Sequence, residues 1–345
     1  MKQKVVYCEL DFLQRFTEKL ASIPFEKQQC WHNTFSFIAK SRIVLNASKE
    51  DLGKVLATNK IVFNLYKRTL EGNNQEKHRW LYNTEATFPN IETFSASSVT
   101  DEILTSTAMF LTTKEKVVCN RIMKKMGILA YNMETILDSD FLYNDCGTSL
   151  PDERRQLNGW KSILEQREIN VCNSLIIIDN YLLQSNVNQN YANKSVNEKV
   201  ENNLLPILDA LLPKKIDVPF QISLFAIEGK EPFSRLANDL KDKIKALRGG
   251  DVKINLQICK CTKEFHDRVL ITNNIWMSSG MGFDLFGAKG FHVNRPTTIS
   301  LLFPFVQTSA PWVEKAYKNI IEKGKMITKN NLCYGDKFEC RLIAL

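Results

Sequence analysis

The chain has 345 residues, of which 44% are hydrophobic, 10% aromatic and 24% charged, and its formal net charge is +8 at pH 7. This composition excludes an intrinsically disordered chain, because it supplies ample apolar material for burial. The length exceeds the roughly 100 to 200 residues of an ordinary domain, so two domains are expected. The positive charge permits a polyanionic partner without requiring one.

The chain shows no sign of export or membrane insertion. No apolar run approaches the roughly 18 residues that a membrane-spanning helix needs. The N-terminus MKQKVVYCELDF places Glu9 and Asp11 where a signal peptide would have its apolar core. The nine cysteines are scattered and form no CxxC pair, which is typical of reduced thiols. We therefore predict a cytoplasmic protein with no cofactor and no bound metal.

The first half alternates apolar runs with helical patterns. KVVYCELDF and SRIVLN predict strands, and Ser48 followed by Asp51 has the spacing of a helix N-cap and its partner. Residues 108–132, AMFLTTKEKVVCNRIMKKMGILAYN, predict a strand, a turn, a helix ending at Gly127 and a second strand. The polar stretch 71–100 is expected to be mostly loop.

A domain boundary is expected near residues 138–152, DSDFLYNDCGTSLPD, where turn-forming residues collect. Beyond it, NSLIIIDNYLL, QISLFAIEG and VKINLQIC predict buried strands, and EPFSRLANDLKDKIKALRGG predicts a helix that ends at the double glycine. Residues 184–203 are predicted as an Asn-rich loop, followed by the helix NLLPILDALLP with Pro206 in its first turn. Such alternation indicates α/β domains with mainly parallel or mixed sheets.

The stretch that is richest in chemistry is FHDRVLITNNIWMSSGMGFDLF, residues 265–286. It keeps the spacing of the pattern H-x-K-x-x-x-x-D-x-x-x-x-x-x-G-S-x-x-N of the phospholipase D superfamily. Counting from His266, the family's lysine, aspartate, glycine, serine and asparagine fall on Arg268, Asn273, Gly280, Met281 and Asp284. The stretch therefore resembles a single, degenerate half of a phospholipase D-like site.

That resemblance implies phosphodiester chemistry, in which an imidazole attacks phosphorus while cations and polar donors hold the phosphoryl oxygens. His266 would be the nucleophile, and Arg268 would clamp phosphate with its planar fork of donors. We expect these two side chains to project side by side from adjacent strand positions into one oxyanion-binding hollow. The candidate catalytic residues are His266, Arg268, Asn273 and Asp284, and the candidate substrate-binding residues are Ser278, Ser279 and Arg295.

The same stretch is similar to the phospholipase D-like domain that lies C-terminal to MIT domains in endosomal-sorting proteins. The shared features are the opening HDR, a tryptophan a few residues on, and a glycine-rich end before an aspartate and an aromatic residue. FHVNRPTTISLLF resembles the next strand of that domain, so the likeness covers roughly residues 170–310. It implies non-catalytic binding of acidic phosphoinositide headgroups.

Catalysis in the phospholipase D superfamily uses two motifs, one for attack and one for protonating the leaving group. The chain has four histidines, and His32, His78 and His292 do not begin an H-x-K or H-x-R. An active enzyme would therefore need a homodimer that brings two copies of His266 together. Whether the protein is an enzyme stays open at this point.

The first half resembles PIN-like nuclease domains, in its first strand KVVYCELDFLQRF and in residues 108–132. Such domains cluster carboxylates around a divalent metal. Here the aspartate position of the first strand is Cys8, and the turn reads Thr112, Thr113, Lys114 and Glu115. A degenerate Rossmann-like domain is expected.

We therefore predict two α/β domains, a PIN-like domain over residues 1–145 and a phospholipase D-like mixed-sheet domain over residues 150–345. The resemblances imply a subunit that binds nucleic acid or cleaves it without a metal, working in a prokaryotic anti-phage defence system with an ATPase partner. The chain itself contains no GxxxxGK[ST] motif. Two alternatives stay open: a membrane module that binds acidic phospholipid headgroups, and a structural subunit of a larger complex.

Overall fold

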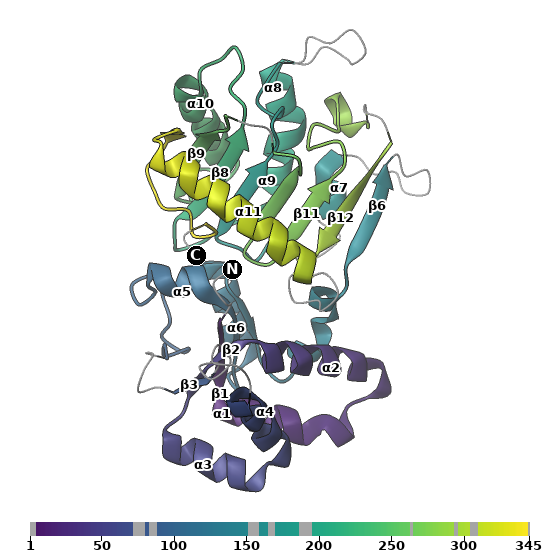
Figure 1. Cartoon of the computed structure of the whole chain (residues 1–345), viewed down its shortest axis with the longest axis vertical. Helices are drawn as coiled ribbons and strands as arrows, with labels where there is room; N and C mark the ends of the chain where they lie inside the picture. Colours follow the sequence, from purple (N-terminus) through teal and green to yellow (C-terminus); the bar gives the residue numbers. More distant parts are fainter. Residues whose placement is uncertain are drawn as a thin grey trace. The chain divides into compact units, whose positions relative to one another are not determined.

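The computed structural model describes residues 5–71, 80–82, 88–150, 159–164, 170–185, 195–262, 265–292, 296–303 and 310–343. They divide into two compact units, with the boundary between Asn144 and Asp145. Each unit has its own sheet and its own helices (Figure 1). The predicted fold class, two α/β domains, is confirmed.

The first unit is built on a five-stranded parallel sheet with the order β3-β2-β1-β4-β5. Its strands are β1 (Val5–Glu9), β2 (Arg42–Asn46), β3 (Trp80–Tyr82), β4 (Thr107–Leu111) and β5 (Leu129–Tyr131). Its α-helices are α1 (Leu10–Glu18), α2 (Phe25–Lys40), α3 (Lys49–Thr58), α4 (Lys60–Glu71), α5 (Asp101–Ser106) and α6 (Lys116–Met126). The strand order reverses direction at β1, as in doubly wound sheets.

Local sequence signals account for two helix boundaries of the first unit. Ser48 accepts a hydrogen bond from the Asp51 backbone N–H at the start of α3. Gly127, at φ +63°, ends α6 in the left-handed conformation that glycine adopts readily. Strand β3 lies in the stretch predicted as mostly loop, and no pattern in the sequence indicated it. Three residues are too short to show the alternation that identifies a strand.

The second unit is built on an eight-stranded mixed sheet with the order β13-β9-β8-β7-β10-β11-β12-β6. Its strands are β6 (Cys146–Leu150), β7 (Ser174–Ile178), β8 (Phe220–Ala226), β9 (Ile254–Lys260), β10 (Val269–Thr272), β11 (Trp276–Ser279), β12 (Thr297–Leu302) and β13 (Cys333–Gly335). Strands β7, β8 and β9 pair in parallel, and the other neighbours pair antiparallel. Strand β6 lies in the predicted domain boundary. It is an edge strand of mostly small and polar residues, so the sequence has no apolar pattern there that would predict a strand.

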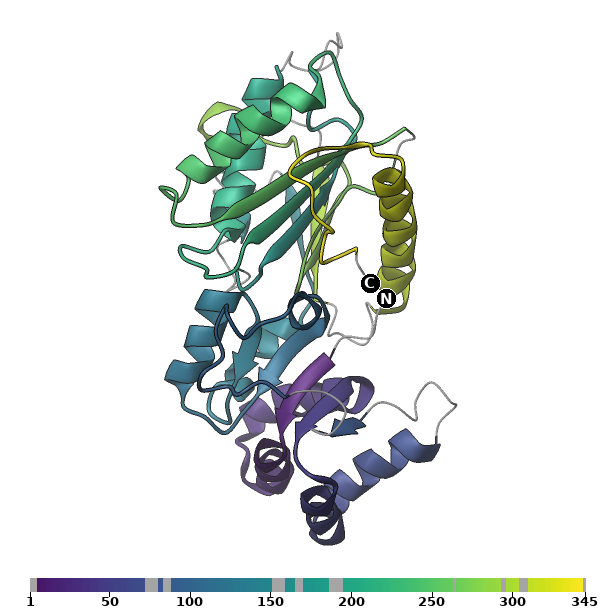
Figure 2. The ribbon, with the colours of Figure 1, turned by 90° about the vertical axis from the view of Figure 1, so that its left-hand side faces the viewer.

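Helices cover both faces of the second sheet (Figure 2). One face carries α7 (Gly159–Leu164), α8 (Val196–Lys199), α9 (Leu205–Leu211) and α10 (Phe233–Ala246), and the other carries α11 (Ala310–Lys329). Between the sheet and α11 lies a buried apolar cluster that includes Ile176, Trp276 and Ile320. Over the ranges that the structure describes, every helix is too short or too polar to cross a bilayer.

The layer of α8 and α9 contains a π-helical turn. A capping box between Ser195 and Glu198 starts α8, and the π-helical segment Val200–Leu204 continues directly into α9. Pro206 cannot donate the N–H bond of an α-helix. The wider turn before it instead joins the Leu205 N–H to the Val200 carbonyl. The predicted loop is therefore wrong over residues 196–203, which are helical although they are rich in asparagine and precede a proline.

Candidate functional site

The motif of the second unit lies at the edge of the sheet where the parallel strands β7, β8 and β9 end. Strand β10 runs antiparallel to β7 with Val269 opposite Ile178, so the residues before β10 lie beside those that follow β7. Strand β11 returns with Ser278 opposite Val269, which brings the glycine-rich segment after β11 to the same edge. Open α/β sheets bind ligands outside the carboxyl ends of their strands. We call this region the carboxyl edge.

His266 and Arg268 both precede β10, which begins at Val269, so the expected placement on adjacent strand positions is wrong. The His266 side chain is fully exposed, and its Nδ1 lies 3.2 Å from the Asp267 Oδ1. Arg268 is half-buried. Its Nη1 donates to the Gly280 carbonyl at 3.2 Å, and its guanidinium carbon lies 5.9 Å from the centre of the Tyr181 ring.

Arg268 and Asp179 meet at Gly282. A Cβ at Gly282, where φ is +84°, would lie 2.6 Å from the Asp179 Oδ2 and 3.0 Å from the Arg268 Cδ. The buried Asp179 follows β7 directly. Its Oδ1 accepts the Tyr181 backbone N–H at 3.0 Å, and its Oδ2 accepts that of Phe283 at 2.8 Å. Only glycine allows this close approach without displacing either side chain.

The charge of Asp179 is controlled by its surroundings. Burial raises the pKa of this carboxyl, because a carboxylate loses its hydration there. The two backbone hydrogen bonds and the positive charges of Arg268 and Lys199 act in the opposite direction on the same pKa. Arg268 is therefore part of the motif and also favours the charged form of Asp179 at the carboxyl edge.

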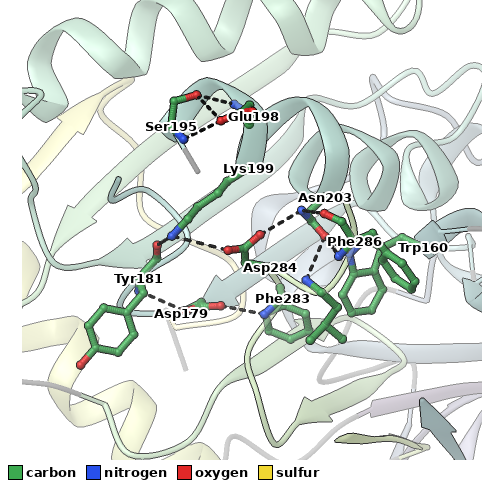
Figure 3. A network of polar contacts seen from close by, with 11 residues as sticks. Trp160, Asp179, Tyr181, Ser195, Glu198, Lys199, Asn203, Phe283, Asp284 and Phe286 are labelled. Carbon is green, nitrogen blue, oxygen red and sulfur yellow. Dashed lines mark hydrogen bonds and ion pairs between the residues drawn. The ribbon is translucent and has the colours of Figure 1, made fainter. Parts of the chain in front are cut away.

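A buried polar network joins the π-helical turn to the glycine-rich segment (Figure 3). Lys199 is completely buried; its Nζ donates to the Tyr181 carbonyl at 2.8 Å and lies 3.6 Å from the Asp284 Oδ2. The Asn203 Nδ2 donates to the Asp284 Oδ1 at 3.2 Å, and its Oδ1 accepts the Trp160 indole N–H at 3.0 Å. Asp284, a predicted catalytic residue, is thus a buried partner of Lys199 and Asn203.

Asn273, at the position of the family's aspartate, lies at the opposite end of β10 from His266. Its Oδ1 accepts the backbone N–H groups of Asn173 at 2.9 Å and Ser174 at 3.1 Å. Its Nδ2 donates to the Asn173 Oδ1 at 3.3 Å. These contacts join β10 to the start of β7. Asn273 therefore does not contribute to the carboxyl edge.

The two candidate serines differ in their surroundings. Ser278 is half-buried on β11, between Val269 of β10 and Ser300 of β12. Ser279 is buried, and its hydroxyl donates to the Gly282 carbonyl, so it stabilises the glycine turn. Arg295 lies outside the described residues. The structure thus gathers His266, Arg268, Ser279 and Asp284 at the carboxyl edge, and separates Asn273 from them.

Sequence reasoning missed three polar residues of this site, Asp179, Lys199 and Asn203. The signal for Asp179 is visible in the sequence, because an acid that directly follows the apolar run LIII stands at the end of a buried strand. Lys199 and Asn203 carry no such signal. They lie in the segment interpreted as a loop, and only the helix shows that they face Asp284.

The first unit has its own strand-order reversal, at the carboxyl ends of β1 and β4. Glu9 ends β1, and its Oε2 accepts the Thr113 backbone N–H at 2.6 Å and the Thr113 hydroxyl at 2.8 Å. Lys114 in the same turn pairs with Glu92 at 2.9 Å. Within the described parts of the chain, no group of three or more His, Cys, Asp or Glu side chains is arranged to hold a metal ion.

Comparison with known proteins gives little guidance. No family model and no curated protein matches the chain. Among solved structures, polyphosphate kinase from Porphyromonas gingivalis aligns at 11% identity and a TM-score of 0.26, over 80% of this chain and 40% of that chain. The chain thus spans about two-fifths of that enzyme's length. At this level of likeness, function has to be inferred from the geometry of the site.

Proposed function

We propose that the second unit binds the phosphate groups of a polyanion at its carboxyl edge, with nucleic acid as the leading ligand. The observation that supports this proposal is the placement of the Arg268 side chain at this edge. Arg268 is half-buried, its guanidinium donates to the Gly280 carbonyl, and the planar fork retains donors that match two phosphate oxygens. The exposed His266 imidazole, two positions earlier, offers a further hydrogen bond at the same edge.

The neighbouring acids support this assignment, because both already have internal partners. Asp179 accepts two backbone N–H groups, and Asp284 is held by Lys199 and Asn203. Among the residues described, the only hydrogen-bond acceptor of the Arg268 guanidinium is the Gly280 carbonyl. The remaining donors of Arg268 are therefore available to an external anion.

The test is the affinity of the purified full chain for single-stranded and double-stranded nucleic acid over a range of salt concentrations. A charge-assisted hydrogen bond contributes roughly 1.5 to 3 kcal/mol, so Arg268→Ala is expected to weaken binding about tenfold or more. The slope of log affinity against log salt should fall by about 1 for a lost phosphate contact. Lys245→Ala, an exposed cation on α10, serves as the matched control and should leave affinity nearly unchanged.

Three outcomes contradict the nucleic-acid proposal. Binding to phosphoinositide vesicles but to no nucleic acid would assign the site to lipid headgroups. Equal losses of affinity in Arg268→Ala and Lys245→Ala would show that nucleic acid is bound by the overall positive charge and not by a site at Arg268. Full function of the His266→Ala/Arg268→Ala protein within its complex would indicate a structural subunit.

Hydrolysis by a homodimer is a second candidate, favoured by the full exposure of the His266 side chain. An imidazole that projects from the surface can meet its copy across a two-fold axis, which supplies the second histidine this chemistry needs. Cleavage should then persist in excess chelator, disappear in His266→Ala and depend on protein concentration. Cleavage that needs a divalent metal would refute this candidate.

The wider context stays a proposal drawn from the sequence. A PIN-like first unit and a place beside an ATPase in an anti-phage system would both suit a subunit that handles nucleic acid. The strand order of the first unit supports no more than a Rossmann-like sheet.

A further inference from the structure

Two cysteines face each other across the last pair of strands in the second sheet. Strand β13 pairs antiparallel with β9, and Cys333 lies directly opposite Cys259. The adjacent pair is hydrogen-bonded, with the Lys260 N–H donating to the Leu332 carbonyl at 2.7 Å. Hydrogen-bonded and non-hydrogen-bonded pairs alternate along such a ladder, so the cysteines form a non-hydrogen-bonded pair.

This register suits a covalent link. Cα atoms of a non-hydrogen-bonded pair are about 4.5 Å apart, which is within the range that disulfides span. The Cys333 and Cys259 Sγ atoms are already 3.2 Å apart. A disulfide of about 2.05 Å requires a further approach of roughly 1 Å, which side-chain rotation supplies without moving the strands.

The two thiols are also suited to different steps. Cys333 is half-buried on the edge strand β13, and the hydrogen bond that it receives from Cys259 lowers its pKa to about 7. Cys259 is buried; the hydrogen bond to Cys333 and the burial raise its pKa well above the ordinary value. Because the thiolate is the nucleophile, Cys333 would react first and Cys259 would remain a thiol.

We propose that Cys333 and Cys259 form a reversible oxidation site that a peroxide closes into a disulfide between β13 and β9. The Cys333 thiolate attacks one peroxide oxygen, and the O–O bond breaks. Hydroxide departs, and Cys333 becomes a sulfenic acid. The Cys259 sulfur then attacks the Cys333 sulfur. The S–S bond forms, the S–O bond breaks, and water leaves with the proton of Cys259. The hydroxide takes up the proton that Cys333 released on forming the thiolate. In all, the two thiols lose two electrons, and one peroxide is reduced to two waters.

The disulfide would fix the C-terminal part of the second unit. Strand β13 follows α11, and the residues after it, including Cys340 and Ile343, belong to the buried cluster between the sheet and α11. Strand β13 is a short strand at the edge of the sheet, where it pairs with β9. A bond that closes a long loop reduces the conformational freedom of the unfolded chain, so the oxidised protein should be more resistant to heat.

The experiment oxidises the reduced full chain with a small excess of hydrogen peroxide, blocks remaining thiols and maps linked peptides by mass spectrometry. We expect one main linked pair, Cys333 with Cys259, which is lost in Cys333→Ser and in Cys259→Ser. Cys172→Ser is the matched control, because Cys172 is a buried cysteine of the same unit, and it should retain the link. Oxidation should raise the melting temperature by roughly 5 °C or more, reversibly with dithiothreitol.

A measurement on the unaltered protein guards against variants that misfold. The rate of alkylation of Cys333 against pH should reach half its maximum near pH 7. Linkage of Cys333 mainly to Cys261 or Cys340 would overturn the proposal. So would irreversible oxidation of Cys333 without any link, or a half-maximal alkylation pH near that of an ordinary cysteine.

Discussion

Replacing Gly282 with alanine tests whether the glycine turn allows Arg268 and Asp179 to share the carboxyl edge. At φ +84° an alanine is strained, and its Cβ would lie 2.6 Å from the Asp179 Oδ2 and 3.0 Å from the Arg268 Cδ. Both side chains must therefore move. The carboxylate that moves is the one that accepts the Phe283 N–H.

The magnitude follows from two contributions to the free energy of unfolding. The left-handed backbone costs an alanine about 1 to 2 kcal/mol. Displacing the buried Asp179 carboxylate, so that the Phe283 N–H loses its acceptor, costs about 1 to 3 kcal/mol more. Gly282→Ala should therefore destabilise the second unit by about 2 to 5 kcal/mol and also weaken polyanion binding through Arg268.

Gly250 provides the control. Its φ of +88° is close to that of Gly282, but nothing lies within 4 Å of a Cβ placed there. Gly250→Ala should lose only the backbone contribution of about 1 to 2 kcal/mol and keep its affinity for polyanions. Urea unfolding followed by tryptophan fluorescence, together with nucleic-acid binding, measures both effects. Equal losses of stability in the two variants would refute the reasoning.

Three further predictions concern buried polar groups. Lys199→Met leaves Asp284 buried without its cation, so urea unfolding should show a loss of about 3 to 5 kcal/mol. Lys54→Ala, at an exposed ion pair, should change stability little, and similar losses in the two variants would contradict this prediction. Because burial raises the pKa of Asp179, its contribution to stability is complete below its ordinary value of 3.8 and is lost as pH rises through the folded pKa. The stability of the wild type relative to Asp179→Asn, measured by urea unfolding at several pH values, should therefore decline above pH 3.8, and an increase would contradict it. Asn273→Ala should cost about 2 to 4 kcal/mol in urea unfolding without changing polyanion affinity, because its hydrogen bonds lie at the far end of β10; weakened binding would show that the two ends of β10 are coupled.

The buried strands were the most predictable part of the fold. Runs such as LIII in β7 are apolar throughout because helices cover both faces of a central strand, and this leaves a clear mark on the sequence. Strands β3 and β6 leave no such mark. One is only three residues long, and the other is an edge strand of small polar residues.

The candidate site was predictable only in part. The segment from His266 to Asp284 brings His266, Arg268 and the glycine turn to one edge of the sheet, because β10 and β11 follow each other in sequence and pair antiparallel. Spacing could not show that Asn273 lies at the other end of the strand. It also could not identify Lys199, which reaches Asp284 through an ion pair between segments far apart in the chain.

The π-helical turn before Pro206 has a consequence for how this helix can vary. Pro206 has no amide N–H with which the backbone could tighten into an ordinary α-helix. The proline therefore keeps the wider turn, and with it the helical register of the residues before it. Lys199 and Asn203 both face the Asp284 carboxylate only while the π-helical turn is kept. Inserting or deleting one residue between Asn203 and Pro206 would turn the preceding part of the helix by about 100° relative to α9 and remove both side chains from Asp284. This short segment should therefore tolerate substitutions on its exposed side far better than any change in its length.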